Sequence, residues 1–290
     1  MIQVTCYSVF ATTKAPFFLP RSVPVHSQKP HPAVQQTDRW HPRVSRHHKH
    51  QLRQGATCAY SGSNAATTLI KICGVTSAED AELAAAAGAH FIGMIMWPKA
   101  KRAVAPAVAL AIAAVARRHG AQAVGVFVDE DARTIAERCR EAGIGVAQLH
   151  GDAAREAVAR LPESVQVIYV MHADSDGVIQ TMQPAQLAAS LGQDLSRPVD
   201  WVLVDGLVGG SGERFDWKNL QAPKEVAQRG WFLAGGLDPH NVAEAVQQLH
   251  PTGVDVSSGV TGPDKLKKDA TKVCAFVSAV QELKTAPQTA

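Results

Sequence analysis

Short apolar runs separated by polar, glycine-marked connections recur along the chain from residue 69 onward. Short runs of this kind are typical of parallel strands buried on both faces. The predicted strands are residues 69–73, 91–96, 123–128, 146–149, 165–170, 201–204, 231–234 and 254–256. Between them, alanine-rich or helix-periodic segments predict helices over residues 80–87, 107–118, 132–142, 153–161, 184–191, 241–249 and 268–283.

This alternation predicts an α/β protein in which eight βα units form a single closed (β/α)8 barrel over residues 67–290. This range is close to the roughly 250 residues that are typical of such barrels. A doubly wound open sheet is the alternative. It is weakened because no G-x-G-x-x-G sequence follows the first strand and because strands continue toward the end of the chain.

The first predicted strand ends in a cysteine, Cys73, followed by Gly74 and a helix-start signal over residues 76–80. In a parallel barrel the carboxyl ends of the strands carry the chemistry, so Cys73 is a candidate functional residue. A lone cysteine is also one of the most commonly buried residue types, so a simple packing role stays open at this point.

Polar side chains and glycines follow the other predicted strands. They are Arg102, His150, Asp205 and Asp255, together with Gly210, Gly235, Gly236, Ser257, Ser258 and Gly259. Glycines and serines after the seventh and eighth strands of a barrel commonly bind phosphate through backbone N–H groups. Cys73 and Asp205 come from opposite sides of the barrel mouth, where a thiol base and a carboxyl acid could act on two sites of one molecule.

Charge is unevenly distributed along the chain. Residues 1–66 hold eight of the 29 Lys and Arg residues and one of the 26 acids, which leaves 21 basic and 25 acidic residues in the body. The overall charge of +3 therefore belongs to the first 66 residues, and we expect no nucleic-acid partner. No apolar run approaches the roughly 20 residues that span a bilayer, so we expect a soluble protein without a membrane partner.

Residues 1–66 are rich in Ser, Thr, Pro, Gln and His and nearly free of acids. This composition predicts a disordered leader that acts as an organelle transit peptide, since a secretory signal needs a continuous apolar segment. A generic disordered tail, or a metal-binding histidine tract at residues 47–50, is the alternative. The five cysteines are widely spaced without a C-x-x-C pair, which argues against disulfides and against a metal site.

Eight segments resemble, in sequence and in order, the phosphoribosylanthranilate isomerase family. They are residues 71–76, 98–102, 124–128, 148–151, 204–205, 209–212 with 215–217, 234–237 and 254–260. One such segment is weak evidence, but eight in register over residues 69 to 281 are specific. The leader and the compact loop after Asp205 look like plant or algal plastid forms, which implies the chloroplast stroma as the location.

The resemblance implies a (β/α)8 barrel that performs an Amadori rearrangement in tryptophan biosynthesis, converting a small phosphorylated substrate without metal or cofactor. By this resemblance Asp205 is the general acid and Cys73 the general base. Arg102, His150 and Asp255 would bind the rest of the substrate. The phosphate would lie against Gly210, Gly235, Gly236, Ser257, Ser258 and Gly259. The family includes monomers and dimers, and we expect a monomer.

Two departures from the family pattern stand out. Glu213 occupies a position where the family often has lysine, and residues 262–268 replace a run that usually contains glutamate and glycine. Both bear on substrate affinity more than on the acid or the base. The alternatives are a sister barrel such as indole-glycerol-phosphate synthase, for which only Lys71 could supply a strand-end lysine, and a catalytically inactive scaffold. The presence of both Cys73 and Asp205 disfavours the scaffold.

Overall fold

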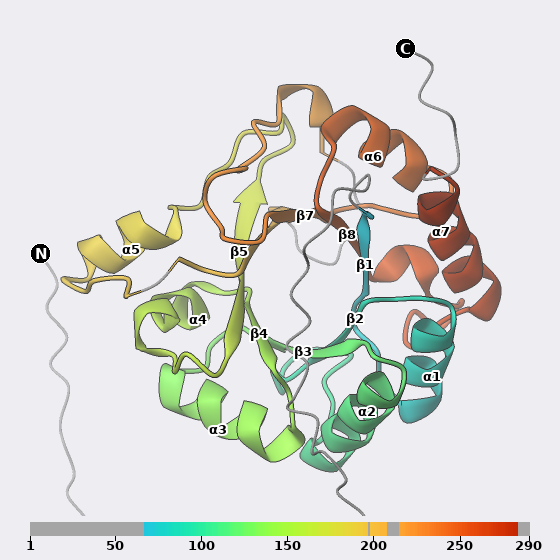
Figure 1. Cartoon of the computed structure of the whole chain (residues 1–290), viewed down its shortest axis with the longest axis horizontal. Coiled ribbons are helices and arrows are strands. Elements are labelled where there is room, and N and C mark those ends of the chain that lie inside the picture. The colour runs from blue at the N-terminus through green and yellow to red at the C-terminus, as the bar shows by residue number, and fades with distance from the viewer. Residues whose placement is uncertain (1–66, 197, 208–214, 284–290) are drawn as a thin grey trace, which may run out of the picture. The chain divides into compact units, whose positions relative to one another are not determined.

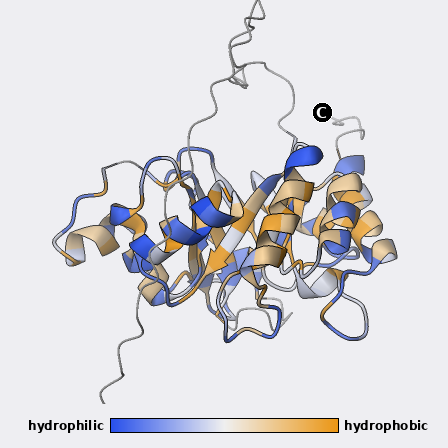
Figure 2. Cartoon of the chain, turned by 90° about the horizontal axis from the view of Figure 1, so that it is seen from below, coloured by the Kyte–Doolittle hydropathy of each residue, from blue (hydrophilic) through white to orange (hydrophobic). Residues whose placement is uncertain are grey.

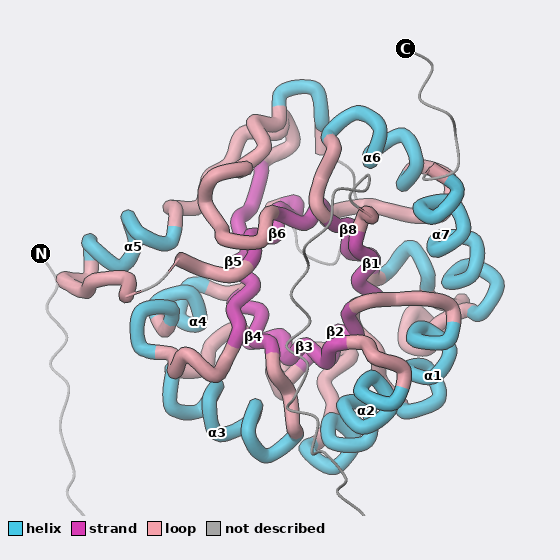
Figure 3. The backbone as a smooth tube through the Cα atoms, viewed as in Figure 1, coloured by secondary structure: helices cyan, strands magenta, loops and turns pink. Residues whose placement is uncertain are grey.

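Eight parallel strands close into a barrel in the computed structural model, which describes residues 67–196, 198–207 and 215–283. The strands follow one another around the ring in chain order, and β8 pairs back to β1 (Figures 1 and 3). They are β1 (Leu69–Ile72), β2 (Phe91–Ile95), β3 (Gln122–Phe127), β4 (Val146–Leu149), β5 (Gln166–Ala173), β6 (Trp201–Gly206), β7 (Trp231–Leu233) and β8 (Gly253–Val256).

Helices surround the ring of strands (Figure 3). They are α1 (Ala78–Ala86), α2 (Pro106–Arg118), α3 (Ala132–Ala142), α4 (Asp152–Glu156), α5 (Pro184–Ser190), α6 (Val242–Leu249) and α7 (Ala270–Glu282), with short 3₁₀ turns η1 (Val158–Arg160), η2 (Trp217–Asn219) and η3 (Ser258–Val260). The predicted (β/α)8 barrel is therefore confirmed.

The buried apolar side chains form two clusters. The smaller one comes from strands and from the residue after β7, and it fills the barrel: Phe91, Val124, Val146, Ile168, Val170, Trp201, Leu203, Phe232 and Ala234. The larger one joins the outer strand faces to the helices. Both faces of each strand are thus covered, which is why the strands are continuous apolar runs in the sequence. Figure 2 shows this apolar colour on the central strands and on the helices packed around them, with polar stretches in the outer connections.

Several predicted boundaries needed correction. The predicted helix over residues 153–161 is two pieces, α4 and η1, because Leu161 precedes a proline and adopts an extended conformation. The predicted helix over residues 268–283 begins only at Ala270, behind the N-cap Asp269, whose carboxylate accepts from the N–H of Lys272.

Two further differences concern β5 and β6. Strand β5 extends to Ala173, three residues beyond its predicted end. Within the described part of the connection from β6 to β7 there is a 3₁₀ turn, η2, and no α-helix. The sixth βα unit therefore lacks its α-helix in those residues. The seven predicted helices include none between residues 204 and 231, although eight complete βα units would require one there.

Some expectations lie outside what the structure describes. The predicted leader over residues 1–66 and the loop residues Gly210 and Glu213 belong to these parts of the chain, and the predictions made for them stay predictions. Of the helices in the described ranges, none combines the length and the apolar character needed to cross a membrane. The same ranges contain no group of three or more metal-binding side chains.

Candidate active site

Cys73 is buried at the carboxyl end of β1, directly after the last strand residue. Its N–H donates to the carbonyl of Val256, 2.8 Å away, so the β1–β8 ladder continues to the cysteine itself. Gly93 on β2 provides the space for the thiol: a Cβ at that position would stand 2.8 Å from Cys73 Sγ and 3.1 Å from Lys71 Nζ. A glycine is required at position 93 by this close approach.

A buried ion pair lies below the thiol. Lys71 Nζ donates to Asp255 Oδ1 over 2.8 Å, and the two residues are register partners on β1 and β8. Burial alone would lower the pKa of Lys71, but the charge of Asp255 and the neighbouring Cys73 more than offset it, and the pKa is raised. Lys71 is therefore a fixed ammonium at the floor of the barrel mouth.

Asp205 lies near the end of β6, close enough to the same ion pair for both of its charges to act on the carboxyl group. Burial raises the pKa of Asp205 to about 7, and the negative charge of Asp255 acts in the same direction. The N–H of Gly206, which donates to Asp205 Oδ1 over 2.9 Å, and the charge of Lys71 offset part of this rise. A carboxyl group with a pKa near 7 can donate a proton at neutral pH, which an ordinary aspartate cannot do.

His150 follows β4 and borders a hollow of about 410 Å³ together with His172 and Leu207. Burial, and then the charges of His172 and Arg155, lower the pKa of His150 to about 3, so its ring is neutral at physiological pH. Its Nδ1 atom is buried and has no hydrogen-bond partner among the residues described. An unpaired buried ring nitrogen of this kind is available to a ligand.

Two neighbours set the orientation of His150. The ring of His172 packs edge-on against it, with centroids 5.1 Å apart. Arg155 Nη1 donates to the backbone carbonyl of His150 over 2.6 Å, which holds the loop after β4 in place.

Arg102 comes from the loop after β2 and folds back over Gly74. A Cβ on Gly74 would lie 3.1 Å from Arg102 Cζ, so the guanidinium covers the turn that follows the cysteine. Its Nη1 is buried and unpaired within the part of the chain that is described. A buried guanidinium nitrogen without a partner is a strong candidate to bind an anion, because a carboxylate or phosphate would satisfy it.

The predicted phosphate loops meet one another. Gly235 and Gly236, after β7, both have positive φ (83° and 65°), a conformation that glycine adopts without strain. Gly259, after β8, packs so closely that a Cβ there would stand 2.1 Å from the carbonyl oxygen of Leu237. The N–H groups of Gly235 and Gly236 donate to no described residue. Free N–H groups on the loop after β7, which packs against the glycine of the loop after β8, are suited to an anion.

Ser257 and Ser258 complete this end of the barrel. Ser257 Oγ donates to the carbonyl of Cys73 over 3.0 Å, which connects the loop after β8 to the end of β1. Ser258 begins η3 and accepts from Thr261 Oγ1 over 2.8 Å. Ser257 therefore has a structural contact as well as a place beside the glycine loops.

The sequence did not identify every residue that contributes to the barrel mouth. His172 lies on β5 beyond the predicted strand end at residue 170, although its spacing of two from Val170 would have placed it on the inner face. Lys268 was assigned to a helix, yet its ammonium reaches the carbonyl of Cys73. The N-cap signal of Asp269 would have placed Lys268 outside that helix.

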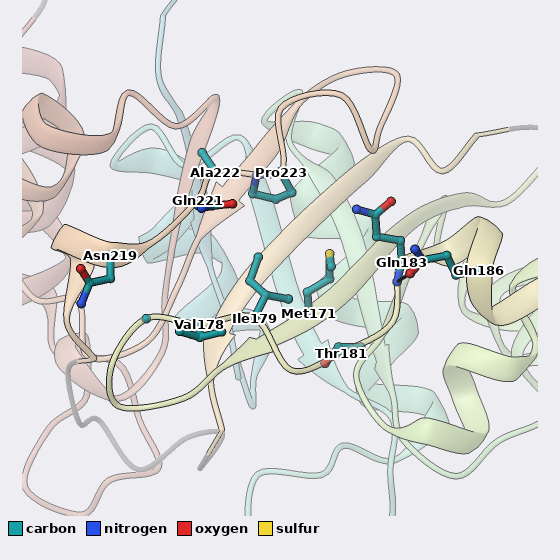
Figure 4. Close-up of a pocket in the computed structure, with 11 residues that line it drawn as sticks. Met171, Val178, Ile179, Thr181, Gln183, Gln186, Asn219, Gln221, Ala222 and Pro223 are labelled. Carbon is teal, nitrogen blue, oxygen red and sulfur yellow. Dashed lines mark hydrogen bonds between the residues drawn. The ribbon is translucent and has the colours of Figure 1, made fainter.

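A second hollow of about 490 Å³ shares Thr181 with the hollow beside His150 (Figure 4). It is bordered by side chains after β5 and by the segment around η2, and its lining is rich in amides: Gln183, Gln186, Asn219 and Gln221. None of the predicted catalytic or binding residues lines it. The predicted site residues described above are therefore those of the barrel mouth and not those of this hollow.

Known proteins resemble this chain throughout the barrel. Residues 70–279 match the family model described as N-(5'phosphoribosyl)anthranilate (PRA) isomerase. The chain belongs to the PRA isomerase family. An Arabidopsis thaliana relative named "N-(5'-phosphoribosyl)anthranilate isomerase 1, chloroplastic" is 43% identical over 215 residues, which cover 74% of this chain and 75% of the relative.

Solved PRA isomerase structures share the fold. The enzyme from Thermus thermophilus is 32% identical with a TM-score of 0.59, and the match covers 74% of this chain and all of that one (100%). A PRA isomerase in complex with reduced 1-(o-carboxyphenylamino)-1-deoxyribulose 5-phosphate is 27% identical with a TM-score of 0.55, covering 74% of this chain and 99% of that one. The family resemblance seen in the eight sequence segments is confirmed.

Proposed function

We propose that this chain converts N-(5'-phosphoribosyl)anthranilate to 1-(2-carboxyphenylamino)-1-deoxyribulose 5-phosphate, with Asp205 as general acid and Cys73 as general base. Family membership supports the reaction. The observation that supports the two roles is the buried Lys71–Asp255 pair. The charge of Asp255 helps to raise the pKa of Asp205, and Cys73 helps to raise the pKa of Lys71. The same ion pair therefore lies close to both Asp205 and Cys73, the two groups proposed to act on the substrate from β6 and β1.

The first step opens the sugar ring. Asp205 donates its proton to the furanose ring oxygen while the bond from that oxygen to C1' breaks, and the nitrogen lone pair forms an iminium ion. The raised pKa of Asp205 supports this role, because the group still holds its proton in about half of the molecules at pH 7. Asp205 leaves this step as a carboxylate.

The second step removes the proton on C2'. The thiolate of Cys73 takes this proton, the electrons move to the iminium nitrogen, and the resulting enolamine tautomerises to the ketone. The fixed ammonium of Lys71 lies beside the sulfur and balances the negative charge of the thiolate. The substrate's own nitrogen accepts the electrons, so the step requires no further electron acceptor.

The remaining predicted residues hold the substrate. The unpaired Nη1 of Arg102 supports binding of the anthranilate carboxylate. The glycine loops after β7 and β8 support binding of the phosphate, and the phosphorylated ligand named for a solved relative agrees with this assignment. We assign the neutral His150 to a substrate hydrogen bond, and Asp255 to holding Lys71 in place.

The location of the protein is part of the same proposal. The chloroplastic names of the Arabidopsis relatives and the acid-poor composition of residues 1–66 support a plastid transit peptide. That the barrel acts as a monomer, without a nucleic-acid partner, remains an expectation from the sequence.

Turnover by the full chain and by two single variants tests the proposal. PRA is generated in situ and its loss is followed by anthranilate-type fluorescence. We expect the wild type to turn over, and Cys73→Ser and Asp205→Asn each to lose about 100- to 10,000-fold in kcat, the usual contribution of an acid or a base.

Two matched variants act as controls. Cys274→Ser changes an exposed cysteine on α7, and Asp176→Asn changes an exposed aspartate after β5, so both should keep wild-type turnover. A folded wild type without turnover would reject the reaction. Turnover that survives both active-site changes would leave the reaction standing and reject the assigned acid and base.

A further inference from the structure

Lys268 is a buried lysine that the proposed chemistry does not use. It lies just before α7, at the end of the segment over residues 262–268 that departs from the family pattern, and its exposed fraction is 7%. Lysines are almost never buried without a partner, because removing the ammonium from water is strongly unfavourable. The partners of this side chain therefore indicate why it is buried.

Both partners of the ammonium are backbone carbonyls at the catalytic end of the barrel. Lys268 Nζ donates to the carbonyl of Cys73 over 2.6 Å and to that of Ser257 over 3.0 Å. These carbonyls belong to the residues that directly follow β1 and β8. One cation thus joins the residue proposed as the base to the loop proposed to bind phosphate.

The backbone of Lys268 is held as firmly as its side chain. Its N–H donates to Asp80 Oδ2 over 3.2 Å, in the first turn of α1. On the other side, the N–H of Asp269 donates to Val260 over 3.0 Å, and Gly262 bonds to Lys267 over 3.0 Å, which closes the segment on itself. Lys268 is therefore anchored at both ends before any substrate binds.

The charges around the ammonium come from several elements. Burial, and then the positive charge of Arg102, lower the pKa of Lys268 to about 8. Cys73, Asp255 and Asp80 act in the opposite direction. The group remains predominantly cationic at pH 7, and charged donors make the stronger hydrogen bonds to carbonyl oxygens.

We propose that Lys268 is a positioning residue that fixes the thiol of Cys73 relative to the phosphate loop by binding the carbonyls of Cys73 and Ser257. This inference rests on the proposed function, because it assigns to Lys268 the geometry that the base requires. Lys268 does not reach the substrate in this role. Its effect passes through the ends of β1 and β8.

Lys268→Met tests the role, because methionine keeps much of the apolar stem and removes the ammonium. Displacing the thiol of Cys73 should worsen its alignment with the proton that it removes and so raise the energy of the transition state. We therefore expect kcat to fall by about 10- to 100-fold. KM should change by no more than about threefold, since the glycine loops retain their own contacts. Lys272→Met is the matched control: among the described residues Lys272 Nζ binds only the carbonyl of Thr261, over 2.9 Å, and its loss should leave kcat unchanged.

Hydrogen exchange separates positioning from general destabilisation. In Lys268→Met we expect faster amide exchange in residues 72–76 and 256–260, with exchange in β3 unchanged. If this variant does not fold, Lys268→Gln, which keeps an N–H donor in a similar volume, should show the same pattern with a smaller loss of kcat.

Three results would overturn the positioning role of Lys268 or separate it from the proposed isomerase function. A folded Lys268→Met with wild-type kcat and wild-type exchange would overturn the positioning role. Uniformly faster exchange across the barrel, with kcat reduced only in proportion to the unfolded fraction, would show that Lys268 stabilises the whole barrel without positioning Cys73. A wild type without turnover would reject the proposed function, while the exchange experiment would still decide whether Lys268 holds the ends of β1 and β8.

Discussion

Asp255 affects two groups with a single carboxylate. It accepts from Lys71 over 2.8 Å and so compensates the burial of that ammonium, and its negative charge raises the pKa of Asp205. A carboxyl group that stays protonated in the folded protein but ionises in the unfolded chain destabilises the fold as pH rises. The protonated state that suits Asp205 for proton donation therefore reduces the stability of the barrel above acidic pH.

The stability of Asp205→Asn relative to the wild type should depend on pH with a definite sign. The pKa of Asp205 is about 7 when folded, against an ordinary value of 3.8. Between pH 4 and 7 the unfolded wild type has lost a proton that the folded state retains, so wild-type stability falls across this window and levels off above it. Asparagine removes this dependence, and its relative stability should rise by at most about 4 kcal/mol over the window.

Urea unfolding of both proteins at several pH values measures this difference. Asp176→Asn, on the surface, should show no comparable trend and acts as the control. A stability difference between Asp205→Asn and the wild type that stays constant from pH 4 to 8 would contradict a raised pKa for Asp205.

The loops after β7 and β8 behave as one element because they are in direct contact. Gly259 packs against the backbone of Leu237, and Asn241 Nδ2 donates to the carbonyl of Gly236 over 2.9 Å, so the helix entering after β7 braces the same loop. Neither loop can move without the other. The proposed phosphate site is therefore rigid before the substrate arrives.

Gly259→Ala should disturb both loops. The new Cβ would stand 2.1 Å from the carbonyl oxygen of Leu237 and 3.1 Å from Asp238 Cα, and both neighbours are backbone atoms. We expect a loss of about 1–3 kcal/mol in the free energy of unfolding, together with a raised KM. Thermal unfolding and steady-state kinetics measure the two effects.

Gly145→Ala is the matched control for this change. A Cβ at Gly145 would meet no heavy atom within 4 Å, so its effect should stay within about 0.5 kcal/mol. Equal stability and equal KM for the two variants would show that the two loops are not coupled.

The predictability of the site differed from residue to residue. Cys73, Asp205 and Asp255 were predicted because each lies on a strand or directly after one, and parallel strands place these ends together. Lys268 was missed because Lys267 and Lys268 form an ordinary basic pair in the sequence, and only the packing of α1, β1 and β8 buries the second of them.

At the scale of the whole molecule, the barrel was predictable because every strand is covered on both faces and so stands out as an apolar run. The sequence predicted no helix between residues 204 and 231, and the described residues of the β6–β7 connection contain no α-helix, only the 3₁₀ turn η2. Strand β5 extends past its apolar run through His172, a polar residue that faces the mouth. The predicted end of β5 was therefore three residues too early.

The uneven charge of the whole chain leads to a prediction for residues 1–66. Fused to a fluorescent reporter and incubated with isolated plastids, this segment should direct import and be removed, because basic, acid-poor leaders act in this way. Residues 67–290 fused to the same reporter serve as the control and should remain outside. Import without residues 1–66 would contradict the transit-peptide proposal.

The pairing of β1 with β8 also has a consequence for biosynthesis. Lys71 and Asp255 are separated by 184 positions in the chain, so the ribosome makes the lysine long before its counter-ion. A nascent chain that already carries Cys73, Arg102, His150 and Asp205 still exposes an unpaired Lys71 and an open edge at β1. Only the last strand, β8, can close that edge, and Lys268, which binds the carbonyl of Cys73, is translated later still.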